Sequence, residues 1–367
     1  MEEYEPGDRV MHPMFGPGIV EKRENADVIV VKFSRVGRKR LSVKHAPLSR
    51  PTDGIDESLT PDTRAYQEWL DKTFAPEGED ARHYLGSHWD PFYDDVLTVV
   101  KRFPDILPKS LLQLPYAESR PPLRSLPPEW PTARHLSWPI RLHGIAFVVT
   151  KRARSGNPEV VSFFPFDHDG ILHELVIEKV HVWKSGVEAQ IECHLGDSSL
   201  TFFDTLFAPN RGWYESGAPC QFILSAFAYK CRAAEDQIIQ TFNPKLTEEF
   251  KAQHPEIASK WPEGGTIPVH TKGAVGLLPV LEWDRDDYYF RGPVRSVKEM
   301  EMLDQPAWRI RATVLRTLDD DRDIDLDIIV TRKVWGAASP PRPGDDIEGA
   351  LWLQGYLWYP GTELLGP

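Results

Sequence analysis

The first fifty residues place glycine, proline and β-branched residues so closely that few folds accommodate them. Gly16 and Gly18 flank Pro17, which predicts a sharp bend of the chain at that point. Residues 28–33 are rich in β-branched side chains, and residues 38–43 form a second strand-like run beyond a glycine turn. Four or five short strands in roughly forty residues predict a small closed or nearly closed barrel.

This segment reads Gly-Asp-x-Val-x-His-Pro-x-Phe-Gly-x-Gly-x-Val, then Val-x-Phe, Gly-x-Lys-x-Leu and Ala-Pro-Leu. It resembles the Tudor-like (SH3-like) C-terminal module of UvrD/PcrA-type repair helicases. In that family the module is a docking domain associated with RNA polymerase and nucleic-acid work, so the resemblance implies a docking head over residues 1–51 of a bacterial protein. The matching residues are Gly7, Asp8, Val10, His12, Phe15, Gly16, Gly18, Val20, Phe33, Lys39, Leu41, Ala46 and Leu48.

The resemblance does not extend to a helicase. In the helicases the module ends an ATPase chain, whereas here it begins the chain, and the sequence contains no Gly-Lys dipeptide and therefore no Walker A loop. The rest of the sequence also lacks the short metalloprotease, esterase and dinucleotide-binding motifs. Three cysteines without Cys-x-x-Cys spacing predict neither a disulfide framework nor a zinc site. We therefore expect a non-enzymatic protein without a metal or another cofactor.

Charge is distributed unevenly along the chain. The formal net charge is −12, yet residues 7–50 contain ten Lys and Arg against four Asp and Glu. A basic head on an acidic body argues against a protein that coats DNA along its whole length. The sequence shows no signal peptide and no apolar run long enough for a transmembrane helix, so we expect a soluble, cytoplasmic protein without membrane contact.

Most of the surplus positive charge of the head falls on one predicted hairpin. Phosphate contact is one interpretation of this hairpin. Contact with an acidic protein surface is the other, and the helicase resemblance favours it, with RNA polymerase as the partner that it implies. The predicted partner-binding residues are Arg35, Arg38, Lys39, Arg40, Lys44 and His45.

After the head, the sequence predicts a helical neck at residues 60–104 and a Pro-rich extended segment at 105–139. Thr60-Pro61 is typical of a helix start, and a second helix is expected from Asp90 until Pro104 stops it. Prolines exclude helix from most of the extended segment. Its leucines and tryptophans favour packing across the body over the alternative of a proline-rich ligand for another protein.

The remaining chain alternates β-type runs with Gly, Pro, Asn and Asp turns, which predicts a β-rich body. A weak repeat relates two segments at equal offsets: Gly217 with Gly344, Leu224 with Leu351, Ala228 with Gly355, and Tyr229 with Tyr356. Two related OB-like barrels would explain the repeat. The fold class is therefore mainly β with α elements. The body is expected to comprise barrels at residues 140–235 and 271–367, with a helical insert at 236–270.

Two charged clusters were considered as metal sites. His168-Asp169 and His173-Glu174 flank Gly170, although a polar turn between two strands is the simpler interpretation. Asp323, Asp325 and Asp327 alternate with apolar residues, so a strand would place three carboxylates on one face. A solvated outer face is favoured there over a cation site. Asp284, Asp286 and Asp287 add to the same acidity.

The sequence thus favours a non-enzymatic adaptor that docks through its head to RNA polymerase or another nucleic-acid-processing machine. One alternative is a single-stranded nucleic-acid-binding protein that uses the OB-like barrels and their aromatic residues, which include Trp335, Trp352, Trp358 and Tyr356. Another is an enzyme whose site is assembled from scattered residues. The oligomeric state is left open.

Overall fold

The computed structural model divides into two compact units, Met1–Ala65 and Tyr66–Pro367. The protein is mainly β, as the sequence predicts. The described residues are 4–12, 16–25, 27–33, 37–43, 48, 61–76, 87–113, 126–127, 130–151, 157–196, 198–242, 251–252, 255, 266–317 and 322–358.

The first unit contains an antiparallel meander of four strands around its own core. The strands are β1 (Arg9–His12), β2 (Gly16–Asn25), β3 (Val28–Phe33) and β4 (Gly37–Ser42). The predicted bend at Pro17 is wrong, because Pro17 lies within β2 opposite Met11 of β1. The alternation of β3 places Ile29, Val31 and Phe33 in the core.

The helix predicted at Pro61 is present and runs from the end of the first unit into the second. Helix α1 (Pro61–Thr73) runs into β5 (Phe74–Pro76), which pairs in parallel with β10. The Trp69 indole N–H donates to the Tyr214 carbonyl at 3.0 Å, and the Lys179 ammonium donates to two carbonyls of the last helical turn. These bonds anchor the helix C-terminus.

The single helix expected from Asp90 to Phe103 is replaced by short turns. They are η1 (Ser87–Trp89), α2 (Leu97–Val100), α3 (Phe103–Ile106) and η2 (Leu107–Lys109). Pro104 does not stop a helix but occupies the first turn of α3, where its missing N–H costs nothing. Of the predicted apolar stripe, Phe92 is buried and Phe103 packs against the same cluster, whereas Leu97 and Val100 are exposed.

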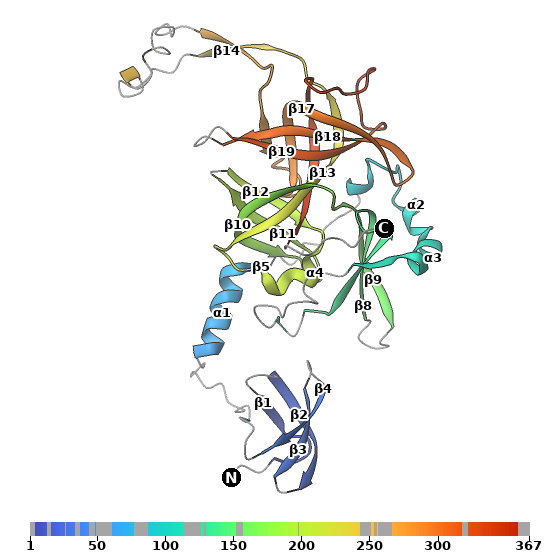
Figure 1. Ribbon diagram of the computed structural model, residues 1–367, viewed down its shortest axis with the longest axis vertical. Coiled ribbons are helices and arrows are strands. Elements are labelled where there is room, and N and C mark those ends of the chain that lie inside the picture. Colours follow the sequence, from blue (N-terminus) through green and yellow to red (C-terminus); the bar gives the residue numbers. More distant parts are fainter. Residues whose placement is uncertain are drawn as a thin grey trace. The chain divides into compact units, whose positions relative to one another are not determined.

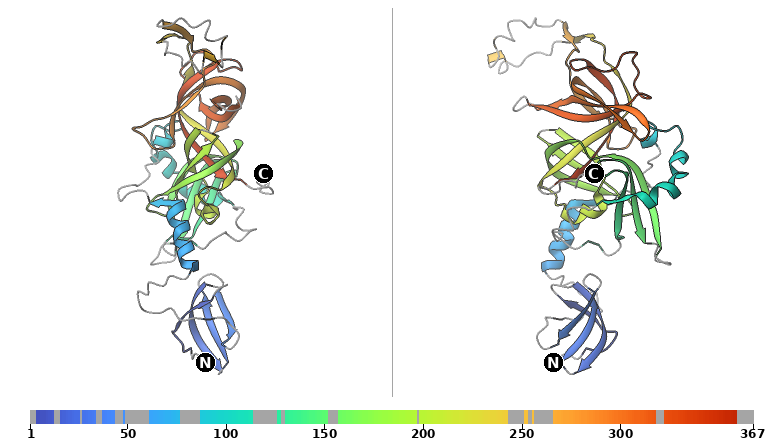
Figure 2. Two further views of the ribbon diagram at one scale, coloured as in Figure 1. Left: turned by 90° about the vertical axis from the view of Figure 1, so that its left-hand side faces the viewer. Right: turned by 45° about the vertical axis from the view of Figure 1, so that its right-hand side comes forward.

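Part of the Pro-rich segment forms strands of a second sheet. Its described residues include β6 (Leu111–Gln113) and β7 (Ala133–Pro139), which join β8 (His143–Lys151) and β9 (Pro158–Asp167) in an antiparallel sheet. Figure 2 shows the short helices beside this sheet, and Phe103 packs edge-on against Phe147 and Phe163. Residues 114–125 lie outside the described residues.

The large sheet of the body closes on itself twice. The first circuit of hydrogen-bonded strands is β10–β11–β12–β20–β13 and back to β10, and the second is β17–β18–β19–β13–β20 and back to β17. We call these circuits ring 1 and ring 2; they share β13 and β20 (Figure 1). The bounds are β10 (Ile171–Val182), β11 (Ala189–Leu195), β12 (Ser198–Asp204), β13 (Pro219–Ala233), β17 (Asp287–Met302), β18 (Gln305–Arg316), β19 (Asp323–Thr331) and β20 (Asp346–Leu357).

The weak sequence repeat corresponds to an approximate two-fold relation between the rings. Leu224 pairs with Gly355 and Ala228 pairs with Leu351, so repeat-related positions pair crosswise about the central Ala226–Leu353 pair. The third strand of each half pairs in parallel with the last strand of the other half. The irregularity of β10 between 177 and 179 matches that of β17 between 294 and 296. Each ring therefore completes itself with one strand from the other half of the chain.

The expected helical insert at 236–270 has a strand near each end, whereas its described residues 251–252 and 255 are helical. β14 (Ile238–Phe242) and β15 (Thr266–His270) pair antiparallel, and β16 (Gly276–Pro279) then adds to β17. The helix start predicted at Asn243 lies outside the described residues. Short turns α4 (Phe207–Asn210) and η4 (Arg211–Trp213) connect β12 to β13.

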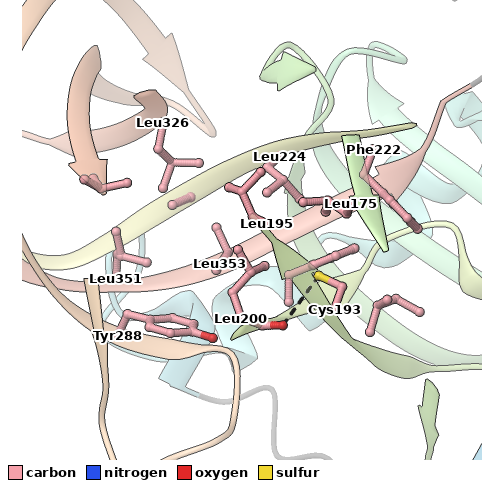
Figure 3. Packing of buried hydrophobic residues seen from close by; sticks show 14 of the residues in the cluster. Leu175, Cys193, Leu195, Leu200, Phe222, Leu224, Tyr288, Leu326, Leu351 and Leu353 are labelled. Carbon is pink, nitrogen blue, oxygen red and sulfur yellow. Dashed lines mark hydrogen bonds between the residues drawn. The ribbon is translucent and has the colours of Figure 1, made fainter. Parts of the chain in front are cut away.

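One hydrophobic core runs through both rings. Figure 3 shows Leu200 and Cys193 of ring 1 near Leu351, Leu353 and Tyr288, which come from β20 and β17. A second cluster packs the outer side of the shared strands against the four-stranded sheet and the short helices; Trp352 is buried there. The body is therefore held together by burial on both sides of β13 and β20.

Candidate functional site

The predicted docking residues that the structure describes lie on β4 and are exposed. The Arg38 guanidinium donates to both carboxylate oxygens of Glu21, at 2.5 and 3.1 Å, and Arg40 donates to Glu24 at 2.6 Å. Strand β3 lies between the partners, so the ion pairs cross the face of the sheet from β4 to β2. Arg35, Lys44 and His45 lie outside the described residues.

These ion pairs make the exposed face of the head mixed in charge. The hydrogen bond from Arg38 lowers the pKa of Glu21, and hydrogen bonds from Lys22 and Arg40 lower that of Glu24. The surplus charge of β4 is therefore partly compensated by β2. A partner of this face would meet alternating charges rather than a uniform cationic strip.

The two histidines considered for a metal site have separate roles. The His168 ring nitrogen lies 2.9 Å from the Thr205 hydroxyl, and burial lowers the His168 pKa to about 3. His173 lies within β10 opposite Phe222, and burial lowers its pKa as well. The interpretation of a polar turn is therefore favoured here, with both imidazoles kept neutral.

The alternating aspartates of β19 are paired with arginines. Asp323 accepts from Arg295 and Arg316, and Asp327 accepts from Arg311 at 2.9 and 3.0 Å. Asp325 accepts from the Thr313 hydroxyl at 2.6 Å. Asp323 is exposed and Asp325 is half-buried, as expected of a solvated strand face, but Asp327 is buried. The arginine partners compensate the negative charge and remove the motive for a cation site there.

A different cluster brings together side chains from two segments that are far apart in the sequence. His88 comes from η1, Asp284 from the turn before β17, and Asp287 from the first residue of β17. One ligand atom from each lies within 4.8 Å of the others. His88 and Asp287 are buried, while Asp284 is half-buried. We refer to these three residues as the imidazole–carboxylate cluster.

The surroundings hold this cluster in place. The Tyr229 hydroxyl donates to Asp287 Oδ1 at 2.7 Å, and the Asp284 amide donates to Asp287 Oδ2 at 3.2 Å. The Trp352 indole donates to Asp286 at 3.1 Å, and its ring stacks on His88 with centroids 3.9 Å apart. Burial, the Asp286 carboxylate and Asp284 raise the pKa of Asp287 to about 8.

Sequence reasoning noted the three aspartates only as surface acidity and did not single out His88. Asp-x-Asp-Asp before a strand was the one available signal, and nothing in the spacing connects it to a histidine in a distant turn. The aromatic residues proposed for base stacking were also misjudged. Trp352 and Tyr356 are buried because they lie on β20, a central strand shared by both rings, while Trp335 and Trp358 are half-buried.

Comparison with known proteins yields no relative: no family model, curated protein or solved structure matches this chain. Among the described helices, none has the length and apolar character needed to span a bilayer. The site must therefore be interpreted from its own chemistry.

Proposed function

We propose that this protein is a non-enzymatic adaptor that works in the bacterial cytoplasm and docks through its head to an acidic surface of RNA polymerase or a nucleic-acid-processing machine. The observation that carries the proposal is that the head is a separate compact unit with an exposed row of Arg38, Lys39 and Arg40 on an outer strand. A self-contained unit with a charged outer strand is suited to bind one partner while the body binds another.

The arrangement of strands supports a finer description of both units. A four-stranded antiparallel meander around a small core is compatible with the SH3-like, Tudor-like module that the sequence resembles. In the body, numbering the first four strands of each half 1 to 4 and the borrowed strand 5 gives the order 1-2-3-5-4-1 in both rings. We propose on this ground that each ring is an OB-like barrel with an exchanged fifth strand.

The strand order is also the observation that favours the second candidate, a single-stranded nucleic-acid-binding protein. OB barrels bind such strands across their second and third strands. In ring 2 that face carries the Arg311–Asp327 and Arg316–Asp323 pairs, which leaves few free cations for a phosphate backbone. Protein docking is therefore the better supported proposal.

The test reverses charge on β4 in the full chain. Arg38→Glu with Arg40→Glu should abolish capture of RNA polymerase from a nuclease-treated bacterial lysate and leave the melting temperature nearly unchanged, because exposed ion pairs contribute little to stability. The matched control is Lys272→Glu with Lys298→Glu, which makes the same charge change at exposed positions of the body and should retain capture.

Titration with single-stranded and duplex DNA separates the two candidates. The contrary result is that the parent protein captures polymerase only from a lysate that has not been treated with nuclease, and binds DNA tightly in a way that Arg38→Glu/Arg40→Glu removes. That result would contradict protein docking and support nucleic-acid binding. Capture by the charge-reversed variant at the level of the parent protein would contradict the role of β4.

A further inference from the structure

We infer that His88, Asp284 and Asp287 form a binding site for one divalent transition-metal ion of the Zn²⁺ or Mn²⁺ type. The three ligand atoms already lie within 4.8 Å of one another and come from two separate segments that the body fold brings together. Around one ion with bonds of about 2.1 Å, ligand atoms are roughly 3.4 Å apart. Small side-chain rotations of Asp284 and His88 would close that difference.

The approximate two-fold relation of the body provides an independent argument that a cation belongs here. Strand register equates Ile171 of β10 with Tyr288 of β17, because they pair with the repeat-related Leu224 and Leu351. The residues just before each strand are then equivalent, so Asp284 and Asp286 correspond to Asp167 and Asp169. Both halves therefore place two aspartates in the same turn.

In the first half, this turn is neutralised by an arginine. Arg309 of β18 donates to both oxygens of Asp167 at 2.8 Å and lies 3.5 Å from the Asp169 carboxylate. The register of β11 and β18 equates Arg309 with Gln190. The first half therefore has a neutral side chain, Gln190, at the position from which the second half supplies the cation Arg309.

The second half also has one more acidic side chain and an imidazole. Asp287 stands where the first half has Gly170, and η1 adds the buried His88. A bound dication would neutralise these carboxylates and accept the imidazole nitrogen as a ligand. The exchange of an arginine for a metal ligand set explains why the two turns differ.

The contacts around the cluster are those expected of a metal site. Tyr229 and the Asp284 amide each bind one oxygen of Asp287 and fix the orientation of its carboxylate. Stacking on Trp352 fixes the plane of the His88 ring. Asp284 and Trp283 also line a pocket of about 300 Å³ on the outer surface, which gives an ion access to the half-buried side of the cluster.

The ligand types select the class of ion. Imidazole nitrogen suits Zn²⁺ and other transition metals, while Ca²⁺ and Mg²⁺ prefer sets made of oxygen atoms alone. One nitrogen and two carboxylates therefore favour Zn²⁺ or Mn²⁺ over Mg²⁺. Three protein ligands would leave a coordination position for water or a partner's side chain.

The test uses the full chain after treatment with EDTA, titrated separately with ZnCl2, MnCl2 and MgCl2 by calorimetry. The parent protein should bind one equivalent of Zn²⁺ or Mn²⁺ and gain about 3 °C or more in melting temperature at saturation. Asp284→Asn should weaken this binding at least tenfold, and His88→Gln should do the same. The control is Asp94→Asn, the same substitution at an exposed position, which should bind like the parent protein.

Because His88 is buried, the His88→Gln result counts only if the circular dichroism spectrum of this variant matches that of the parent protein. If the spectra differ, the variant of the half-buried Asp284 decides the test. The inference would be overturned by a parent protein that binds neither Zn²⁺ nor Mn²⁺. It would equally be overturned by Asp284→Asn binding with unchanged affinity, which would place the ion elsewhere. Binding of Mg²⁺ as tight as that of Zn²⁺ would contradict the proposed ion class.

Discussion

At the scale of single residues, the body buries an ionisable group whose hydrogen-bond partners among the described residues are uncharged. Asp204 ends β12 and is buried; its carboxylate accepts from the Leu206 amide at 2.9 Å and from the Tyr214 hydroxyl. Burial raises its pKa to about 7, although both hydrogen bonds lower it. The folded state therefore favours the protonated carboxyl more than the unfolded state does.

This gives a prediction for stability as a function of pH. A carboxyl whose folded pKa is raised contributes stability below about pH 4, and this contribution is lost as the pH rises to about 7, with a total on the order of 4 kcal/mol. Asn cannot ionise, so Asp204→Asn should gain stability relative to the parent protein as the pH rises from 4 to 7. Urea unfolding of both proteins across this range measures the difference.

Subtracting the pH profile of stability of the parent protein from that of Asp204→Asn also cancels the contributions of other titrating groups. Burial lowers the pKa of His135 to about 4 and that of His168 to about 3, so these groups remove stability as the pH falls below about 6.5. Their effect is common to both proteins. Parallel profiles for parent and variant would contradict the assignment to Asp204.

At the scale of elements, β17 has to change partners along its length. Its first residues pair with β20 up to Pro293, and from Val294 it pairs with β18. Gly292 stands at this change, where a Cβ atom would lie only 1.7 Å from the Thr313 carbonyl oxygen. The strand can bend from one partner to the other because this residue has no side chain.

Gly292→Ala should therefore destabilise the body by at least about 2 kcal/mol, because backbone must move to admit the methyl group. The matched control is Gly276→Ala in neighbouring β16, where a Cβ atom meets nothing within 4 Å. Chemical unfolding followed by tryptophan fluorescence compares them. Equal unfolding midpoints for the two variants would show that the strand bends without requiring glycine at 292.

At the scale of the whole molecule, the exchanged strands make the two halves of the body dependent on each other. Ring 1 needs β20, and ring 2 needs β13, so neither half closes its own ring. The head differs, because its four strands pair only with one another and surround their own core. Domain independence therefore applies to the head and not to the rings.

Truncated chains test this difference. A chain of residues 66–270 lacks β16 to β20 and should give a poorly dispersed amide NMR spectrum, because β13 would expose its buried face. A chain of residues 1–65 should give a dispersed spectrum. A well-dispersed spectrum of the 66–270 chain would mean that ring 1 closes without β20, and a collapsed spectrum of the 1–65 chain would contradict the independence of the head.

Local features of the chain were determined by the sequence alone. Alternation of β-branched residues located β3 and most strands of the body, and Thr60-Pro61 located the start of α1, because strand and helix periods depend on neighbouring residues. The repeat was also visible at Leu224 and Leu351. The apolar stripe after Asp90 wrongly predicted one long helix, because buried turns have the same apolar composition as a buried helix.

Only the tertiary structure decided which segments meet. The parallel pairing of β12 with β20 has no signature within either strand, since a strand's pattern specifies its buried face and not its neighbour. For the same reason the Glu21 partner of Arg38 and the approach of His88 to Asp284 and Asp287 were not foreseen. Ion pairs and metal-ligand clusters depend on distances in space. The fold determines these distances independently of how far apart the residues are in the sequence.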